Sequence, residues 1–182
     1  MALLDANVLY PARLRDLLIR LAIAGLYQAR WSEQILDECF DNLIEDRPDL
    51  TEGQLARTRR LMTTALPDAA VAGYEERIDQ YDLPDPDDRH VLEAAVTAGA
   101  SLLVTDNLDD FPDDRIPVGL RVVSPDEFVL ALADDDFDVV VEVVEDQAAG
   151  LANPPMTTSQ LLDGLEEVGL VESVGLIRPA IS

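Results

Sequence analysis

The residues of this sequence that could do chemistry are carboxylates, and two of them stand at matching positions. Asp5 directly follows a short apolar run, and Asp106 directly follows a second one, Ser101 to Thr105. If both runs are parallel strands, their carboxylates lie close together at one sheet edge, where α/β proteins bind ligands. Like charges this close repel each other unless a cation intervenes. Hard oxygen ligands of this kind suit Mg²⁺ or Mn²⁺.

Further acids occur where they could join such a site. Glu38 stands three residues after Ile35, at the border of an apolar helical stripe, where a carboxylate is costly to desolvate unless it is paired or metal-bound. Acids like these also have an ordinary structural interpretation, because aspartates are common in turns and stabilise helix N-termini. Both interpretations stay open for Asp85, Asp87 and Asp88 at the start of one helix, and for Asp109 and Asp110 after Asp106.

Other kinds of active site have too few residues to build on. The sequence has one histidine, His90, and one cysteine, Cys39. A histidine-paired nucleophile, a zinc site of cysteines and histidines, and an internal disulfide are therefore not expected. No phosphate-binding loop, dinucleotide fingerprint or nucleophile elbow occurs either. The single cysteine fits a reducing cytoplasm.

The charge balance restricts how the chain could meet nucleic acid. It carries 37 acids and 13 bases, all of them arginines, for a formal net charge of −24. A broad basic face is excluded, so any nucleic-acid binding needs bound cations and local arginines. The acidity also leaves open a domain that only holds cations or a basic partner. Residues 1–66 balance ten acids with eight arginines, which makes this part the more favourable approach for nucleic acid.

The elements that must position these carboxylates follow from apolar periodicity, prolines and glycines. Strands are predicted where short apolar runs end in polar residues, and helices where apolar residues recur at helical spacing after a cap. The order of strand, helices, strand, helix, strand is typical of an α/β protein with a mainly parallel sheet. The predicted strands are 2–5, a short one within 69–74, 101–105 and 120–123; the predicted helices run from Pro11 to Gly25, from Trp31-Ser32 to Pro48, from Thr51 to Ala65, from Asp87 or Asp88 to Ala98, and from Ser124-Pro125 onward.

The chain divides into an α/β part and an acidic tail. Residues 1–130 contain the predicted strands, whereas residues 131–182 indicate an acidic helical extension with a capped helix from Thr157 to Val168. The extension could pack on the core, dimerise or cover the site. No apolar run is long enough to cross a membrane, and the N-terminus lacks the pattern of a secretory signal.

Four strings of the sequence together resemble a known family. DANVL, ILDECFDNL, PDPDDRHVLEAAV and SLLVTDNLDDFP, in this order and at these intervals, are similar to the PIN-domain family, and within it to VapC-type toxins of bacterial toxin–antitoxin pairs. The resemblance covers roughly residues 1–130. It implies a three-layer α/β/α fold with a mainly parallel central sheet. It also implies a metal-dependent ribonuclease that hydrolyses RNA phosphodiester bonds with bound Mg²⁺ or Mn²⁺.

The resemblance further implies roles for individual residues. Asp106, an additional acid directly after Thr105, departs from the family pattern, so either Asp110 or Asp106 is the fourth metal ligand. The catalytic carboxylates and metal ligands that it implies are Asp5, Glu38, Asp88 and Asp110, with Asp106 as the alternative ligand. The supporting residues are Asn7, Thr105 and Asn107, and the expected RNA contacts are Arg13, Arg15 and Arg89.

The partners implied by the resemblance are an RNA substrate, a cognate VapB-like antitoxin and a second copy of the chain. A bacterial cytoplasmic location, with no membrane contact, is expected as well. Two alternatives remain open. One is a PIN nuclease that processes RNA without an antitoxin, and the other is an acidic domain that binds cations or a partner without turnover.

Overall fold

The computed structural model describes residues 1–152 and 154–181, with all of their side chains except those of Glu76 and Asp79. Within these residues, five parallel strands form one sheet in the order β3-β2-β1-β4-β5. The central position of β1 places the residue after it in the middle of the carboxyl edge. The strands are β1 (Ala2–Leu4), β2 (Ala29–Ser32), β3 (Ala70–Val71), β4 (Leu102–Val104) and β5 (Arg121–Val123).

The ends of β1 and β4 lie side by side. Leu4 pairs with Val104 in the parallel register, and the Asp5 amide then donates to the Val104 carbonyl at 3.1 Å. Thr105, the residue directly after β4, donates its amide to the Val123 carbonyl of β5 at 3.1 Å. Asp5 and Thr105 therefore leave the sheet as neighbours, as the two apolar runs predicted.

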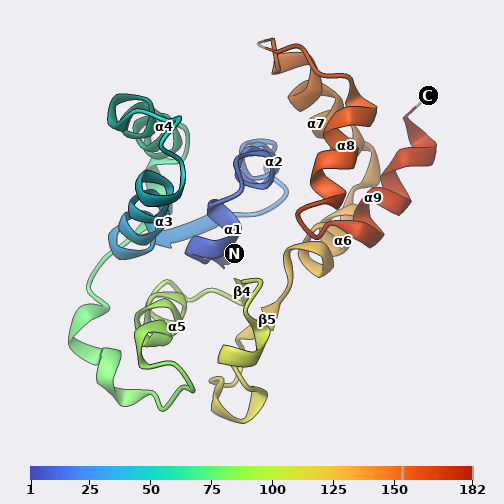
Figure 1. The fold of residues 1–182 in the computed structure, drawn as a ribbon. Helices are drawn as coiled ribbons and strands as arrows, with labels where there is room; N and C mark the ends of the chain where they lie inside the picture. The colour runs from blue at the N-terminus through green and yellow to red at the C-terminus, as the bar shows by residue number, and fades with distance from the viewer. Residues whose placement is uncertain (153, 182) are drawn as a thin grey trace.

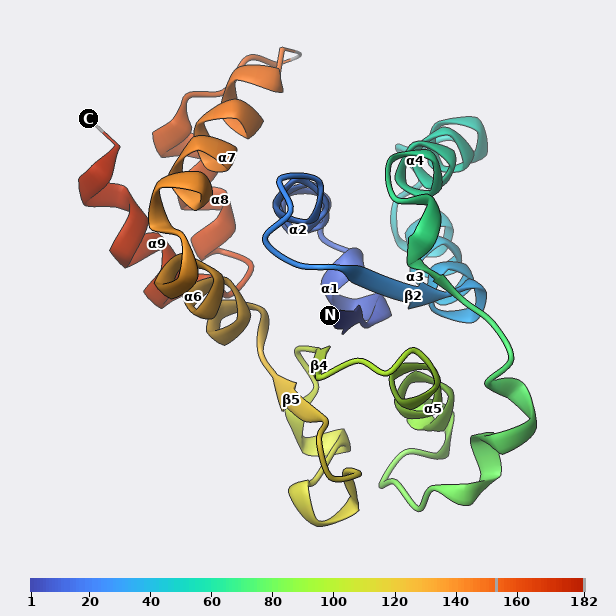
Figure 2. The same cartoon turned by 180° about the vertical axis from the view of Figure 1, so that it is seen from behind.

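Helices cover both faces of the sheet, which confirms the predicted α/β class with a mainly parallel sheet. Helices α2, α3 and α4 lie on one side of the sheet and α5 lies on the other (Figures 1 and 2). The chain changes sides between β1 and β4, and α/β proteins bind their ligands at such a switch point. The helices of this part are α1 (Ala6–Leu9), α2 (Ala12–Ile23), α3 (Glu33–Asp46), α4 (Glu52–Ala65) and α5 (Arg89–Thr97).

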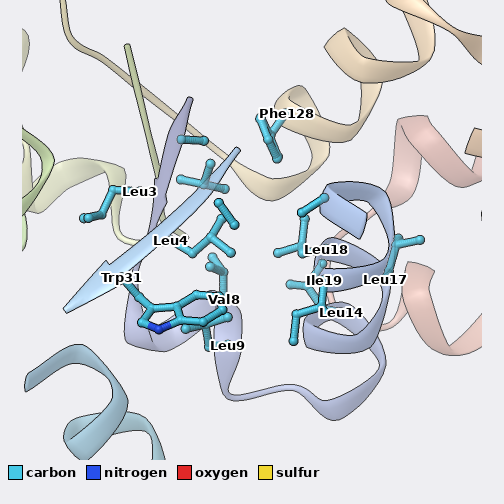
Figure 3. Close-up of a cluster of buried hydrophobic side chains, with 14 of the residues drawn as sticks. Leu3, Leu4, Val8, Leu9, Leu14, Leu17, Leu18, Ile19, Trp31 and Phe128 are labelled. Carbon is cyan, nitrogen blue, oxygen red and sulfur yellow. The ribbon is translucent and has the colours of Figure 1, made fainter. Parts of the chain in front are cut away.

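The core is formed where the central strand meets α2. The three residues of β1 are fully buried, as expected for a strand with helices on both faces. Leu14 and Leu18 of α2 point toward Leu4 of β1, while Leu17 points to the opposite side of α2 (Figure 3). Helix α2 therefore has two buried faces, one against the sheet and one against the extension.

The predicted helical extension is present, and it packs on α2 away from the sheet. Helices α7 and α8 contact α2, and the four helices pack against one another in turn (Figures 1 and 2). The buried side chain of Gln147 on α7 donates from Nε2 to the Arg13 carbonyl of α2 at 2.9 Å. The helices after β5 are α6 (Pro125–Asp135), α7 (Phe137–Gly150), α8 (Thr158–Glu166) and α9 (Val171–Ile177). They are called the extension below, and they begin at Pro125, whereas the predicted extension began at residue 131.

None of the helices in the described part of the chain is long and apolar enough to cross a membrane.

Short 3₁₀ turns connect several of the elements. The turn at Pro86–Asp88 leads directly into α5, so that an acidic segment stands at the edge of the sheet. The turns are Pro67–Ala69, Glu75–Gln80, Pro86–Asp88, Leu108–Asp110, Asp113–Arg115 and Arg178–Ala180.

Two details of the predicted elements were wrong. Trp31 does not begin a helix but belongs to β2, which was not predicted because the polar Arg30 and Ser32 interrupt its short apolar run. Ser32 ends this strand and also caps α3, accepting from the Ile35 amide at 3.1 Å, so the predicted cap is confirmed. Pro11 is the N-cap of α2 rather than its first helical residue. The short strand predicted within 69–74 is present as β3 (Ala70–Val71).

Within the extension, a side chain of α6 caps the N-terminus of α9. The carboxylate of Asp126 in α6 accepts from the amides of Glu172 and Ser173 at 2.8 and 2.9 Å, at the start of α9. We expect Asp126→Ala to lower the free energy of unfolding by about 1–2 kcal/mol, since it leaves two helix-terminal amides without an acceptor. Chemical denaturation measures this loss. The control Asp135→Ala removes an equal charge from an exposed position of α6, and an equal loss there would contradict the cap.

Candidate active site

The carboxylate of Asp5 lies at the centre of the sheet's carboxyl edge. Asp5 ends β1 in an extended conformation and caps α1, with its Oδ1 accepting from the Ala6 amide at 2.6 Å. Its side chain is almost fully buried, at 4% exposure. The other oxygen, Oδ2, accepts from Thr105 Oγ1 at 2.7 Å and from Asn7 Nδ2 at 2.9 Å. Both oxygens of Asp5 are thus fixed in orientation by two residues of α1 and by Thr105, the residue after β4.

Asn7 and Thr105 connect the two strand ends through a shared hydrogen-bond network. Asn7 Nδ2 lies 2.8 Å from Thr105 Oγ1, and Asn7 Oδ1 accepts from the Asp106 amide at 3.1 Å. Thr105 Oγ1 also accepts from the Asn107 amide at 3.1 Å. The three residues predicted as supporting therefore meet around Asp5, and they hold the loop after β4 against the start of α1.

Burial raises the pKa of Asp5 above its ordinary value. Loss of solvent is the largest cause, and the hydrogen bonds from Thr105 and the Ala6 amide oppose it. The negative charge of Glu38 raises the pKa further, whereas His90 lowers it. A buried carboxylate that faces a second acid is stabilised in its charged form when a cation joins the two.

An open cleft of about 760 Å³ begins at Asp5 and is bordered by acids from several elements. Glu38 reaches it from α3, and Asp88 reaches it from the turn before α5. Three of the four carboxylates implied for catalysis thus line one cleft at the switch point of the sheet. Its polar lining consists of Asp5, Asn7, Tyr10, Gln34, Glu38, Asn42, Asp46, Asp87, Asp88, His90 and Asn107.

The pKa of Asp88 reflects the negative charges around this cleft. Its pKa is raised to about 6, first by partial burial and then by the charges of Asp5, Asp110 and Asp85. Asp110 does not line the cleft, yet its charge reaches Asp88. Asp106 also lies outside the lining, and its pKa is raised by partial burial rather than by a neighbouring acid. Asp5, Asp85 and Asp110 are therefore close enough to Asp88 for their charges to raise its pKa.

These carboxylates line one cleft, but they do not converge on a single point within it. In residues 1–152 and 154–181, no group of three or more histidine, cysteine, aspartate or glutamate side chains stands ready to hold a metal ion. Like charges are expected to stay apart when no cation lies between them. The donor set itself, carboxylate oxygens with little nitrogen or sulfur, has the chemistry that Mg²⁺ and Mn²⁺ prefer.

The three arginines expected to contact RNA do not line this cleft. Arg15 is buried and donates from Nη1 to the carbonyls of Leu9 and Tyr10, at 2.6 and 3.2 Å. The guanidinium of Arg13 packs over Gly164 of α8 and lies 3.8 Å from Glu167. Arg89 is half-buried at the start of α5, and its Nε has no hydrogen-bond partner among the described residues. Arg15 is therefore used inside the fold, and Arg13 is directed toward the extension.

The comparison with known proteins agrees with this fold. The PIN-domain family model matches residues 1–109, which is more than half of the chain and includes Asp5, Glu38 and Asp88. This chain belongs to the PIN-domain family.

The C-terminal third of this PIN-domain protein also has a match. The VapC50 C-terminal domain model matches residues 125–179, the segment that forms α6 to α9. A Mycobacterium tuberculosis protein named "Putative ribonuclease VapC50" is 40% identical over 85 residues, which are 44% of this chain and 48% of that protein. The chain thus covers about half of the length of this relative. No solved structure matches the chain. These findings confirm the resemblance to VapC-type PIN proteins.

His90 of this PIN domain contacts a candidate ligand, which the sequence did not predict. Its side chain is 3% exposed, and its Nε2 lies 2.8 Å from Oε1 of Glu38. The other ring nitrogen, Nδ1, is buried without a hydrogen-bond partner in the described part of the chain. The one signal in the sequence was its position two residues after Asp88, at the start of α5. His90 orients Glu38 toward the cleft much as outer residues orient metal ligands.

Removing this contact is expected to weaken the site without unfolding the protein. We expect His90→Phe to lower the affinity for Mn²⁺ by roughly 10–100-fold, the cost of losing an outer partner of a metal ligand. His90→Gln keeps a donor for Glu38 and is expected to lose less. Calorimetric titration with Mn²⁺ measures both variants. An unchanged affinity in a folded His90→Phe protein would show that His90 only fills space.

Proposed function

We propose that this PIN-domain protein is a divalent-metal-dependent ribonuclease that acts as a VapC-type toxin. The observation that carries the proposal is the convergence of Asp5, Glu38 and Asp88 on one cleft at the switch point of a PIN-family sheet. The chemistry is hydrolysis of RNA phosphodiester bonds. The name of the mycobacterial relative, a ribonuclease, supports the same reaction.

The proposed metal is Mg²⁺ or Mn²⁺, held by Asp5, Glu38, Asp88 and a fourth acid. Such an ion, when bound, lowers the pKa of a water ligand and neutralises charge on a phosphate. For the fourth acid we propose Asp110 ahead of Asp106. The charge of Asp110 contributes to the raised pKa of Asp88, whereas Asp106 has no such influence on that residue.

The chain's own residues have distinct tasks in this proposal. Thr105 and Asn7 donate to Oδ2 of Asp5 while the Ala6 amide donates to Oδ1, and His90 contacts Oε1 of Glu38. Such fixed ligands need no rearrangement when substrate arrives, which is how preorganised sites gain rate. Arg89, directly beside Asp88, remains the proposed phosphate contact. Because the cleft is acidic, RNA is expected to enter it only when divalent cations neutralise these carboxylates.

The partners follow from the VapC-type resemblance. We propose that RNA is the substrate, that a VapB-like antitoxin inhibits the enzyme, and that the chain forms a homodimer in the cytoplasm. We also propose that residues 1–130 carry the nuclease and residues 131–182 form an appended layer. The start of the VapC50 C-terminal match at residue 125, close to this division, supports the last point.

Cleavage of a labelled single-stranded RNA pool by the purified protein tests the proposal. We expect cleavage with Mg²⁺ or Mn²⁺ and none with EDTA. Cleavage that continues in EDTA would contradict the metal dependence. A search for an adjacent small gene that encodes a DNA-binding antitoxin separates a toxin from an RNA-processing nuclease. If such a gene is found, expression without it should arrest growth and expression with it should not.

The high acidity of the chain supports a second candidate, a domain that binds cations without turnover. The net charge of −24 and the acidic cleft would both serve such a role. Tight Mn²⁺ binding by a folded protein that cleaves no RNA in the pool would favour this candidate over the ribonuclease.

A further inference from the structure

Helix α3 extends the cleft well beyond the candidate metal ligands. Gln34, Glu38, Asn42 and Asp46 follow one another at intervals of four residues, and all four line the cleft. Residues at this spacing share one face of a helix. With a rise of 1.5 Å per residue, the row is about 18 Å long. Glu38 belongs to the candidate metal site, so Asn42 and Asp46 form an arm of the cleft that the proposed chemistry does not use.

An aromatic ring faces the far end of this arm. Tyr10 follows α1, is half-buried, and donates its hydroxyl to Asp46 Oδ2 at 3.2 Å. The buried Arg15 fixes the backbone here, because its Nη1 donates to the carbonyls of Leu9 and Tyr10. Among the described lining residues, Tyr10 is the one phenylalanine, tyrosine or tryptophan. The ring is thus held at a defined place opposite α3.

The charges of the arm indicate which part of an RNA strand fits there. No arginine lines the cleft within the described residues, and the Asp46 carboxylate would repel a phosphate. A nucleobase is uncharged, and its flat face stacks on aromatic rings. Its N–H groups donate hydrogen bonds. The Asp46 carboxylate can accept them, and so can the amide oxygen of Asn42. The arm therefore suits a base, with the phosphates directed toward the metal site and solvent.

We propose that Tyr10, Asn42 and Asp46 form a base-binding subsite for single-stranded RNA. The base stacks on the Tyr10 ring and donates to Asp46, while Asn42 contacts its edge. Guanine is the expected base, because its Watson–Crick edge offers two adjacent N–H donors to one carboxylate. This inference rests on the proposed ribonuclease function, and it determines which sequences are cleaved rather than whether cleavage occurs.

Sequencing the ends produced from a random single-stranded RNA pool tests the subsite. The wild-type protein with Mn²⁺ is compared with Tyr10→Leu, Tyr10→Phe and Asp46→Asn, and with Glu45→Gln as a matched control. Glu45 is exposed on α3 next to Asp46 but does not line the cleft. We expect wild-type ends to be enriched in guanine at one fixed position near the cut. Asp46→Asn should reduce this enrichment about tenfold, and Glu45→Gln should keep it.

Steady-state kinetics on one enriched RNA gives an independent measurement. Tyr10→Leu should raise KM about tenfold with little change in kcat, while Tyr10→Phe retains stacking and restores most of the affinity. Cleavage with the same base preference in wild type, Tyr10→Leu and Asp46→Asn would overturn the subsite and leave the ribonuclease intact. A wild-type protein that cleaves nothing in the pool would instead overturn the proposed function, and the subsite with it.

Discussion

Replacing Asp5 with asparagine is expected to reduce metal-dependent RNA cleavage by more than about 100-fold. Even the loss of an outer partner of a metal ligand costs roughly 10–100-fold, so the loss of a central ligand should cost more. Asp5 is the most buried of the candidate carboxylates and is held at both oxygens. Single-turnover cleavage of a labelled RNA with saturating Mn²⁺ measures the effect.

The Asp5→Asn variant should still fold, which separates loss of chemistry from loss of structure. Asparagine has nearly the same shape, and it removes a buried charge whose pKa is raised by desolvation. Far-ultraviolet circular dichroism and the melting temperature check the fold. Asp109→Asn is the matched control, since Asp109 is exposed and does not line the cleft. If Asp5→Asn cleaves as fast as Asp109→Asn, the site has been placed wrongly.

Divalent cations are expected to stabilise the protein strongly at pH 7 and weakly at pH 5. A ligand present at 100 times its dissociation constant stabilises by about 2.7 kcal/mol, which is roughly 5–11 °C in melting temperature for a chain of this size. Metal binding requires charged carboxylates. The pKa of Asp88 is raised to about 6, so this carboxylate is largely protonated at pH 5 and competes poorly for metal.

The metal-free protein should show the opposite dependence on pH. A carboxyl group whose pKa is higher in the folded than in the unfolded chain binds more protons when folded. Its contribution to stability is fully present below its ordinary value of 3.8 and is lost as the pH rises through about 6. In EDTA, the melting temperature should therefore fall between pH 5 and pH 7. Asp88→Asn should flatten this slope, and a slope that stays the same would exclude Asp88 as its source.

The sequence predicted those parts of the site that depend on where strands end. Asp5 and Thr105 follow buried apolar runs, and parallel strands bring their carboxyl ends to one edge. Glu38 could be placed on the correct helix face because the apolar stripe of α3 is regular. The fold class followed from the same regularities.

Other features depended on tertiary contacts that no local pattern records. The contact between His90 and Glu38 joins residues 52 positions apart on two helices, and each alone is unremarkable in the sequence. Arg13 and Arg15 were expected to contact RNA on the basis of the family resemblance. Arg15 instead binds two carbonyls inside the fold, and Arg13 faces the extension, whose position on α2 the sequence did not indicate.

The two buried faces of α2 have a consequence for how the molecule unfolds. Two family models match separate parts of the chain, yet a single hydrophobic core contains residues of β1, α2, α7 and α8. If the extension detached, the leucines of α2 that it covers would meet water, and so would the apolar face of α7. Neither part therefore has a complete interior of its own. The whole chain should melt cooperatively in one transition, and a fragment lacking the extension should aggregate rather than fold.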